Sequence, residues 1–399
     1  MTQNKTYDAI IVGGGLSGLT LSCLLGQRGL KVTCIDVDDP KKKPQDPRTT
    51  VISYGSQQVL RRAGAWEKLG PCGEIEHIEI LDGSSPVLLE FMSREAEGKV
   101  FGWNIDNHDL KIALMARMKE IGGNIEHIAP AKVADFQTHD DHVDVHLADG
   151  SALQTRLVVG ADGRGSFTRN WMAQHLGLQT RGWSYHQRAV ICNITHEHPH
   201  NNVAIEHFWP QGPFAVLPMA DDEEGRPCSS IVFTEHGPEK NSLMRLSDED
   251  FLLALAARIP ERYGNIDVSV RRRAFPLTLV HAAEYIGPRM VLVADAAHGI
   301  HPIAGQGLNL GFRDLDALDL LIGAAQDTGE DIGSSALLER YQQKRRPDNM
   351  AMIAVTDGLT RLFSNNIPPV RFLRKAGLKM VAKLPPAKRF FMKQAMGDR

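Results

Sequence analysis

The sequence predicts an α/β fold in which a parallel sheet is interrupted by an antiparallel sheet and followed by a helical tail. Three observations predict it. Apolar runs at 7–12 and 31–36 enclose a glycine-rich turn and a helical stretch, which is the pattern of a βαβ unit. From about 185 to 273, short β-branched and aromatic runs alternate with turn residues, as in an antiparallel sheet. A buried-type strand returns at 290–294 and leads into a helix at about 307–325.

The remaining elements follow from the same two periodicities. In the first half of the chain we expect strands within 75–91 around a turn at 82–86, a helix at 108–121, and strands at 142–147 and 153–159. In the antiparallel region we expect strands at 189–194, 203–208, 214–217 and 229–234, then a helix at 248–259. Beyond 337 the chain is predicted to be helical, with breaks at Pro368–Pro369 and Pro385–Pro386.

Composition excludes several classes of protein. The 399 residues are enough for two domains that share a core. A formal net charge of −3 makes nucleic acid an unsuitable partner. The sequence contains no uninterrupted apolar run of about 18 residues, so we predict no transmembrane helix. The five cysteines form no Cys-x-x-Cys pair, so we expect reduced thiols in a cytoplasmic protein.

The first glycine-rich turn, Gly13–Gly18, fits the pattern G-x-G-x-x-G. Gly13 permits a tight turn, Gly15 lets a pyrophosphate approach the backbone, and Gly18 allows close packing of helix on strand. Leu16 and Ser17 open the helix whose N-terminus would face the phosphates. Asp36 ends the next strand, where a carboxylate accepts hydrogen bonds from ribose hydroxyls. The spacing indicates an adenine dinucleotide, without separating FAD from NAD, and a glycine-rich turn in a nucleotide-free fold is the alternative.

The second turn contains Asp162 and Gly163, directly after the apolar run 157–159. An Asp-Gly pair after a strand is most often a structural turn. The alternative is that this acid, its glycines and the nearby arginines line a groove for a charged cofactor.

The third turn begins at Asp295 and ends in the glycine-rich start of a helix, which contains Gly305, Gly307, Leu308 and Asn309. A carboxylate at a strand end suits a ribityl hydroxyl, and helix N–H groups would face the anion that a reduced flavin ring carries. His298 and His301 invite a metal site. However, Asp295 has a better use on the ribityl chain and no cysteine completes a site, so we predict no metal.

Together the three turns resemble those of the class A flavoprotein aromatic hydroxylases, in the same order and at similar separations. Ala294 departs from that pattern, which usually has glycine there. Within the group the sequence is most similar to the ubiquinone-biosynthesis hydroxylases of the UbiH, UbiF and VisC type. Two stretches carry this similarity, Asp46–Ser56, which looks like D-x-R-x-x-A-I-S, and Ala296–Asn309, which looks like A-A-H-x-x-H-P-x-A-G-Q-G-x-N.

The resemblance implies FAD as the cofactor, with Arg48 near its phosphates or ring and the Gly305–Asn309 segment against the isoalloxazine. It places His301 and Pro302 in a loop beside the flavin, where His301 either transfers a proton or braces the loop. The implied reaction is hydroxylation of a polyprenylated phenol by O₂ through a flavin C4a-hydroperoxide. NAD(P)H is the implied transient reductant, although no second G-x-G-x-x-G provides a domain for it.

The resemblance and the element pattern together predict a Rossmann-like FAD-binding domain, an inserted antiparallel β-sheet substrate domain and a C-terminal tail. The FAD-binding domain would comprise 1–74, 98–184 and 274–360, the substrate domain 75–97 and 185–273, and the tail 361–399. The tail holds ten Lys or Arg and one acid, with interspersed apolar residues. It therefore reads as a basic amphipathic segment for a membrane surface, with the inner face of the cytoplasmic membrane as the implied location. A helix packed on the protein body, or a contact with other ubiquinone-biosynthesis proteins, is the alternative.

Two other functions remain open at this stage. One is a flavin enzyme that inserts no oxygen, such as a reductase or halogenase, although the halogenase pattern would need a Trp where Ile105 stands. The other is a non-catalytic FAD-bound member of a biosynthetic assembly.

Overall fold

The structure is a computed structural model of the chain. It describes residues 5–40, 42, 46–83, 85, 87–237, 242–301, 305–363, 374, 377–378 and 380–397. Pro302 and the predicted break at Pro368–Pro369 lie outside the described residues.

The first sheet has five parallel strands in the order β8-β2-β1-β11-β18, with antiparallel strands added at one edge. Its strands are β1 (Lys5–Val12), β2 (Val32–Ile35), β8 (Ile125–Ile128), β9 (Val133–Thr138), β10 (Val143–Leu147), β11 (Ala152–Gly160), β17 (Ile286–Gly287) and β18 (Met290–Leu292). The chain leaves β1 toward β2 on one side, while β11 lies on the other. The carboxyl end of β1 is therefore a topological switch point, where open α/β sheets bind ligands.

The second sheet has eight strands in the order β19-β16-β12-β15-β14-β13-β5-β6. They are β5 (His77–Asp82), β6 (Leu89–Met92), β12 (Thr180–His196), β13 (Val203–Trp209), β14 (Gly212–Pro218), β15 (Cys228–His236), β16 (Ile266–Ala282) and β19 (His298–Gly299). Neighbouring strands are antiparallel except β13 and β5, which pair in parallel.

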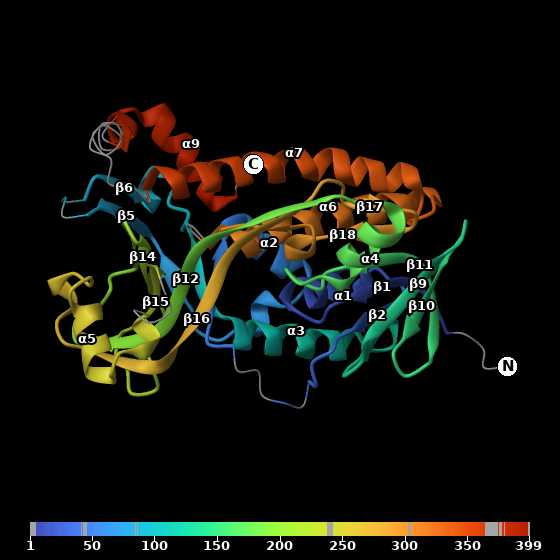
Figure 1. The fold of residues 1–399 in the computed structure, drawn as a ribbon, viewed down its shortest axis with the longest axis horizontal. Coiled ribbons are helices and arrows are strands. Elements are labelled where there is room, and N and C mark those ends of the chain that lie inside the picture. Colours follow the sequence, from blue (N-terminus) through green and yellow to red (C-terminus); the bar gives the residue numbers. More distant parts are fainter. Residues whose placement is uncertain are drawn as a thin grey trace.

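Two strands of 17 residues, β12 and β16, run without a break from the second sheet toward the first (Figure 1). Both cross the predicted domain boundaries at 184/185 and 273/274, so continuous strands connect the two halves. Their register shifts between Ser184 and Gln187, where His186 has a φ of +55°. A β-bulge thus lies at the point where β12 passes from one half to the other.

A small antiparallel sheet and the helices complete the fold. The sheet consists of β3 (Thr49–Ser53), β7 (Gly102–Asp106) and β4 (Gly73–Ile75). The helices are α1 (Leu16–Gln27), α2 (Tyr54–Arg62), α3 (Asn107–Ile121), α4 (Phe167–Leu176), α5 (Asp248–Ala256), α6 (Gln306–Thr328), α7 (Ser335–Phe363) and α9 (Pro385–Met396). No helix in these described stretches is both long and apolar enough to span a bilayer.

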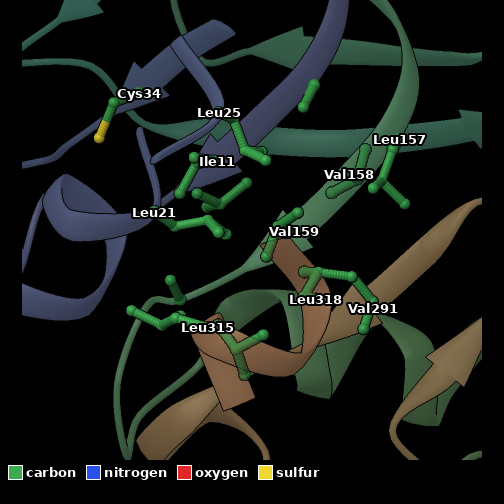
Figure 2. Close-up of a cluster of buried hydrophobic side chains, with 14 of the residues drawn as sticks. Ile11, Leu21, Leu25, Cys34, Leu157, Val158, Val159, Val291, Leu315 and Leu318 are labelled. Atoms are coloured by element: carbon green, nitrogen blue, oxygen red, sulfur yellow. The ribbon is translucent and has the colours of Figure 1, made fainter. Parts of the chain in front are cut away.

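The main core lies between the parallel sheet and the helices α1 and α6. Figure 2 shows Ile11, Val159 and Val291 from the strands facing Leu21 of α1 and Leu315 of α6. All five side chains are fully buried. Ile10 and Val158, which alternate with Ile11 and Val159 along their strands, are fully buried as well, so β1 and β11 are covered on both faces and read as continuous apolar runs.

The C-terminal tail packs on the second sheet. Met392 and Met396 of α9 are buried in an apolar cluster with Ile75, Leu89 and Phe91. On this face of α9 the structure therefore shows the alternative given for the tail, a helix packed on the body of the protein.

Candidate cofactor site

The three predicted turns meet because neighbouring strands of the parallel sheet end in register. Val12 pairs with Ile35 on one side and with Gly160 on the other, and Gly160 pairs with Leu292. The residues that follow these ends come from segments far apart in the sequence. They are Asp36, Gly13, Asp162 and Asp295, which therefore form one row along the carboxyl edge of the sheet.

The glycines of the first turn have distinct roles. Gly13 has a φ of +110°, and a Cβ on it would lie 2.5 Å from the carbonyl oxygen of Ala161. A Cβ on Gly18 would lie 1.9 Å from the carbonyl oxygen of Gly13, so only glycine lets α1 pack this closely. A Cβ on Gly15, by contrast, would meet no atom within 4 Å, and α1 begins there without a side-chain cap. The first N–H groups of α1 therefore face open space suited to a phosphate.

Asp36 borders the same turn at the end of β2. A Cβ on Gly14 would lie 2.4 Å from Oδ2 of Asp36, which puts this carboxylate directly against the turn. Lys111 Nζ lies 3.8 Å from the same oxygen. The sequence predicted this placement through the spacing from Gly13.

The Asp162 carboxylate is engaged within the second turn. Its Oδ1 accepts a hydrogen bond from Ser166 Oγ at 2.5 Å, and its Oδ2 accepts from the backbone N of Thr168 at 2.9 Å. Both donors belong to the start of α4, so the carboxylate anchors the N-terminus of that helix. Gly163 has a φ of +75°, and a Cβ on it would meet no atom within 4 Å. The backbone of this turn, more than the Asp162 side chain, is thus open to a ligand.

Arg164, one of the two arginines that the sequence indicated could line a groove for a charged cofactor, connects the second turn to the third. Its Nε donates to Asp295 Oδ2 at 3.1 Å, and its other nitrogens donate to the carbonyl oxygens of Thr278 and Ile300 at 3.0 and 2.6 Å. The Asp295 side chain remains 37% exposed, so its carboxylate is held in place while still reachable by a hydroxyl ligand.

Ala294, directly before Asp295, adopts the left-handed backbone conformation with a φ of +53°. A Cβ on Gly311 of α6 would lie 2.7 Å from the Ala294 Cβ and 3.6 Å from Ser17 Oγ. The third turn is therefore inserted between α6 and the start of α1. The positive φ gives a physical reason for glycine at this position in the resembling family.

A buried polar cluster lies behind the third turn. Asp314 Oδ2 accepts hydrogen bonds from Ala294 N at 3.0 Å and from His298 Nε2 at 2.5 Å, and Asp314 Oδ1 accepts from Arg345 Nε at 2.7 Å. Asn349 Nδ2 adds a fourth bond at 3.1 Å. Burial alone would raise the pKa of Asp314, but the charges and hydrogen bonds of His298 and Arg345 outweigh it and lower the pKa to about 2. His298 is thus a brace for the loop.

The start of α6 is attached to β3 by Asn309. The Asn309 side chain is fully buried; its Oδ1 accepts from Ser53 N at 2.9 Å, and its Nδ2 donates to the carbonyl oxygens of Val51 and Gly305 at 2.8 and 3.1 Å. Both N–H groups of the amide and one lone pair of its oxygen therefore have protein partners, which leaves this buried side chain little capacity for a ligand. Gly305, with a φ of +63°, begins the helix without a side-chain cap. A contact from this segment to a cofactor would therefore come from backbone N–H groups.

Gly307 and Leu308 occupy the first turn of the same helix. A Cβ on Gly307 would just touch Ile300 Cγ1, at 4.0 Å, and Leu308 is partly buried against the main core. Gly307, which has no side chain, therefore leaves the backbone of the helix N-terminus uncovered at its own position.

Arg48 brings positive charge to the same region. Its guanidinium makes two hydrogen bonds of 2.7 Å with Asp46 and lies 5.1 Å from the ring centre of Phe275 on β16. The hydrogen bond with Asp46 raises the pKa of Arg48, and the charge of Asp295 adds to this effect. Arg48 therefore lies within electrostatic range of the Asp295 carboxylate.

His301 is fully buried. Its ring packs edge-on against Tyr185 at 4.8 Å between centres, and Nε2 lies 3.4 Å from Gln187 Oε1. Burial, with a smaller effect of the Arg164 charge, lowers the pKa of His301 to about 4. The imidazole is therefore neutral at neutral pH, which suits a brace or a neutral hydrogen-bonding group. Its role beside a flavin stays a prediction.

Sequence reasoning assigned no supporting role to Asp314 or Arg345, and it offered Arg164 only as an arginine that could line a groove for a charged cofactor. Arg164 and Asp314 stand inside or just beyond the recognised motifs, so their position was visible but their partners were not. Arg345 lies 31 residues after Asp314 on a different helix, and no local pattern connects the two.

Comparisons with known proteins agree with this geometry. The family described as "FAD binding domain" matches residues 6–356. The chain is 40% identical to Ubiquinone hydroxylase UbiL of Rhodospirillum rubrum, over 99% of this chain and 91% of that protein. It is 32% identical to 3-demethoxyubiquinol 3-hydroxylase of Escherichia coli, over 99% of each chain. The crystal structure of p-nitrophenol 4-monooxygenase PnpA from Pseudomonas putida DLL-E4 has the same fold, with a TM-score of 0.79 at 19% identity over 99% of this chain and 100% of that one.

Proposed function

The chain belongs to the FAD-binding family of aromatic hydroxylases, and on that basis we propose that it hydroxylates the ring of a polyprenylated phenol in ubiquinone biosynthesis. The observation that carries the proposal is the row of three turns at the switch point of the parallel sheet, in a chain that matches ubiquinone hydroxylases along nearly its full length. FAD is the cofactor, and O₂ and the phenol are the substrates.

The residues present fit FAD. Asp36 would bind the adenosine ribose, and the uncapped start of α1 beside Gly15 would bind the pyrophosphate. Asp295, held by Arg164, would accept hydrogen bonds from the ribityl chain. The backbone at Gly163 and at Gly305–Leu308 would complete the cradle. Bound FAD supplies the activation of O₂ and the transfer of one oxygen atom to an electron-rich ring.

The protein's own contribution is to orient, to exclude water and to supply charge. The N–H groups at the start of α6 favour an anion, and Arg48 adds positive charge nearby. The second sheet, whose strands β12 and β16 reach the site, would hold the phenol ring. His301, which is neutral, would hold its own loop in position without adding charge to the site.

A direct test is turnover of the FAD-loaded protein with a polyprenylated phenol under ¹⁸O₂. We expect NAD(P)H, as the transient reductant, to reduce the flavin faster when the phenol is present, and one ¹⁸O atom to enter the product. Hydride transfer without ¹⁸O in the product would instead identify a reductase. Bound flavin with no phenol-stimulated reduction would identify a non-catalytic member of an assembly.

A test in the cell identifies the step. Deletion of the gene, in a strain without a redundant enzyme, should lead to accumulation of one quinone precursor, and mass spectrometry of that intermediate would give the ring position. A normal quinone pool in such a strain would contradict the proposal.

We also propose that α9 brings the enzyme to the inner face of the cytoplasmic membrane, where its substrate dissolves. While Met392 and Met396 face the protein, Phe390 and Phe391 on the other side of α9 are 58% and 44% exposed. The exposed side of α9 also carries Arg389 and Lys393, and Lys383 and Leu384, just before the helix, are exposed as well. Aromatic rings between basic residues suit an anionic lipid surface.

Vesicle flotation tests this location. The FAD-loaded protein should float with anionic vesicles, and Phe390→Ser with Phe391→Ser should abolish flotation. Leu253→Ser on α5 is the matched control, because Leu253 is also a highly exposed apolar side chain. Flotation that survives the double phenylalanine change would contradict a membrane role for α9 and favour contacts with other ubiquinone-biosynthesis proteins for its exposed side.

A further inference from the structure

A cluster of metal-binding side chains lies on the hairpin formed by β9 and β10. The backbone N of His139 donates to the carbonyl oxygen of His142 at 2.8 Å and closes the turn, and Asp144 follows on β10. One donor atom from each of His139, His142 and Asp144 lies within 4.8 Å of the others. The three side chains are 34%, 26% and 21% exposed, so an ion in solution could reach them.

The distances from the two histidines to the Asp144 carboxylate are close to the spacing that a small metal ion needs. His139 Nε2 lies 3.1 Å from Asp144 Oδ2, and His142 Nε2 lies 3.7 Å from Asp144 Oδ1. With metal–ligand distances near 2.1 Å, tetrahedral Zn²⁺ requires donors about 3.4 Å apart. The two imidazole rings stack at 4.4 Å between centres with an angle of 20°, so both Nε2 atoms are presented to the same carboxylate.

A fourth residue supports one of these ligands. His142 Nδ1 is 2.6 Å from Asp141 Oδ1, a hydrogen bond in which the neutral ring donates to the carboxylate. This bond leaves the lone pair on Nε2, on the side of Asp144. Histidines that bind metals usually donate their other ring N–H to a carboxylate in this way.

We propose that His139, His142 and Asp144 form a binding site for a divalent first-row transition metal of the Zn²⁺ type. Two imidazole nitrogens and one carboxylate select such ions over Mg²⁺ and Ca²⁺, which prefer all-oxygen sites. Water would fill the remaining position, and His139 would bind the ion in the tautomer that carries its proton on Nδ1. The prediction of no metal rested on the two histidines His298 and His301 and on the scattered cysteines, and it did not consider the spacing His-x-x-His-x-Asp at 139–144.

The site is separate from the cofactor cradle. Val143 pairs with Thr155 on β11, five residues before Gly160, which is about 17 Å along the strand. The hairpin tip also contacts the loop before β18, where Arg289 Nε donates to the carbonyl oxygen of Asp140 at 2.7 Å. A metal here would fasten the hairpin and would stabilise the folded chain without taking part in the flavin reaction.

Calorimetric titration of ZnCl₂ into the chelator-treated, FAD-loaded protein tests the proposal. We expect one saturable site, with affinity reduced roughly ten-fold or more in His139→Ala, in His142→Ala and in Asp141→Asn. Asp140→Asn is the matched control in the same turn and should bind Zn²⁺ like the wild type, while MgCl₂ should give no saturable binding. Retained FAD absorbance and an unchanged circular dichroism spectrum would show that each variant is folded.

Three results would overturn the proposal. The first is the absence of saturable Zn²⁺ binding to the wild type. The second is binding that both histidine variants retain at full strength, because the ion would then be bound elsewhere. The third is Mg²⁺ binding of equal strength that the same variants abolish, because the site would then not select for nitrogen-binding metals.

Discussion

Asp314 holds Ala294 in a left-handed backbone conformation: its Oδ2 accepts the Ala294 N–H at 3.0 Å, and Ala294 has a φ of +53°. A residue with a Cβ is strained there, and the hydrogen bond helps to maintain the strained turn. The next residue is Asp295, so the pair positions the carboxylate that we assign to the ribityl chain.

Replacing Ala294 by glycine should stabilise the protein. Glycine adopts a positive φ without strain, and we expect the free energy of unfolding to rise by about 0.5–1 kcal/mol, measured by urea denaturation. Ala296→Gly in the same turn is the control and should lower it by about 1 kcal/mol, because Ala296 is buried and has no positive φ. Equal losses in both variants would show that Ala294 is not strained.

Asp314→Asn should destabilise the protein by about 3–5 kcal/mol, because it leaves Arg345 buried without its carboxylate partner. Asp316→Asn on the same helix is the control; it removes an exposed ion pair with Arg62 and should cost less than about 1 kcal/mol. A loss of similar size in both variants would mean that the buried cluster contributes no more than a surface pair.

The Asp314 carboxyl should also make the stability of the folded protein depend on pH in the acid range. The pKa of Asp314 is about 2 in the folded protein, against 3.8 ordinarily, so the unfolded chain binds the proton more readily. Its contribution to stability is therefore present above about pH 4 and is lost as the pH falls toward 2. Denaturation curves between pH 5 and pH 2 should fall more steeply for the wild type than for Asp314→Asn.

Gly15 and Gly18 should separate cofactor binding from folding. Gly15→Ala introduces a methyl group into open space beside the α1 N-terminus, so we expect unchanged stability without FAD but an affinity for FAD at least about ten-fold weaker, measured by fluorescence titration. Gly18→Ala brings a methyl group against the Gly13 backbone and should lower the melting temperature itself. Gly123→Ala, in an open turn remote from the row of strand ends, should change neither property. Normal FAD affinity in Gly15→Ala would contradict the assignment of the pyrophosphate site to this turn.

Glu206 on β13 should make stability decline with rising pH. It is partly buried between Ala204 and Phe208, has no hydrogen-bond or ion-pair partner in the described part of the chain, and burial raises its pKa from 4.5 to about 8. The folded protein keeps this proton while the unfolded chain loses it, so stability falls between about pH 4.5 and 8, by up to about 1.4 kcal/mol per pH unit. Glu206→Gln should lack that decline, whereas Glu249→Gln on exposed α5 should keep it. Parallel curves for wild type and Glu206→Gln would contradict this.

The parts of the fold that the sequence predicted are those whose signals are local. The first βαβ unit was predicted because its glycine pattern lies within six residues, and at Gly18 the steric reason is equally local, since a Cβ there would meet the Gly13 carbonyl oxygen. The small sheet of β3, β7 and β4 was missed, since Ser53 pairs with Gly102, nearly fifty residues further on. The full length of β16 was missed as well, because three arginines and Pro276 interrupt its apolar pattern.

The site shows the same division. The acidic residues at the strand ends could be identified from the sequence, but their hydrogen-bond partners could not. Asp162 and Asn309 both stand in cofactor motifs, but in the structure their side chains are occupied by the start of α4 and by β3. Only three-dimensional contacts distinguish a side chain that meets a ligand from one that shapes the turn presenting it.

The unbroken course of β12 and β16 has a mechanical consequence. Because both strands are continuous, a force on the sheet that would hold the ring is transmitted directly to the cofactor site. We expect bending at the bulge between Ser184 and Gln187, where the register of the β12–β16 pairing shifts at the junction of the two halves. Stiffness of these two long strands is therefore the property by which this architecture would keep a hydrophobic ring and a flavin edge at a fixed distance.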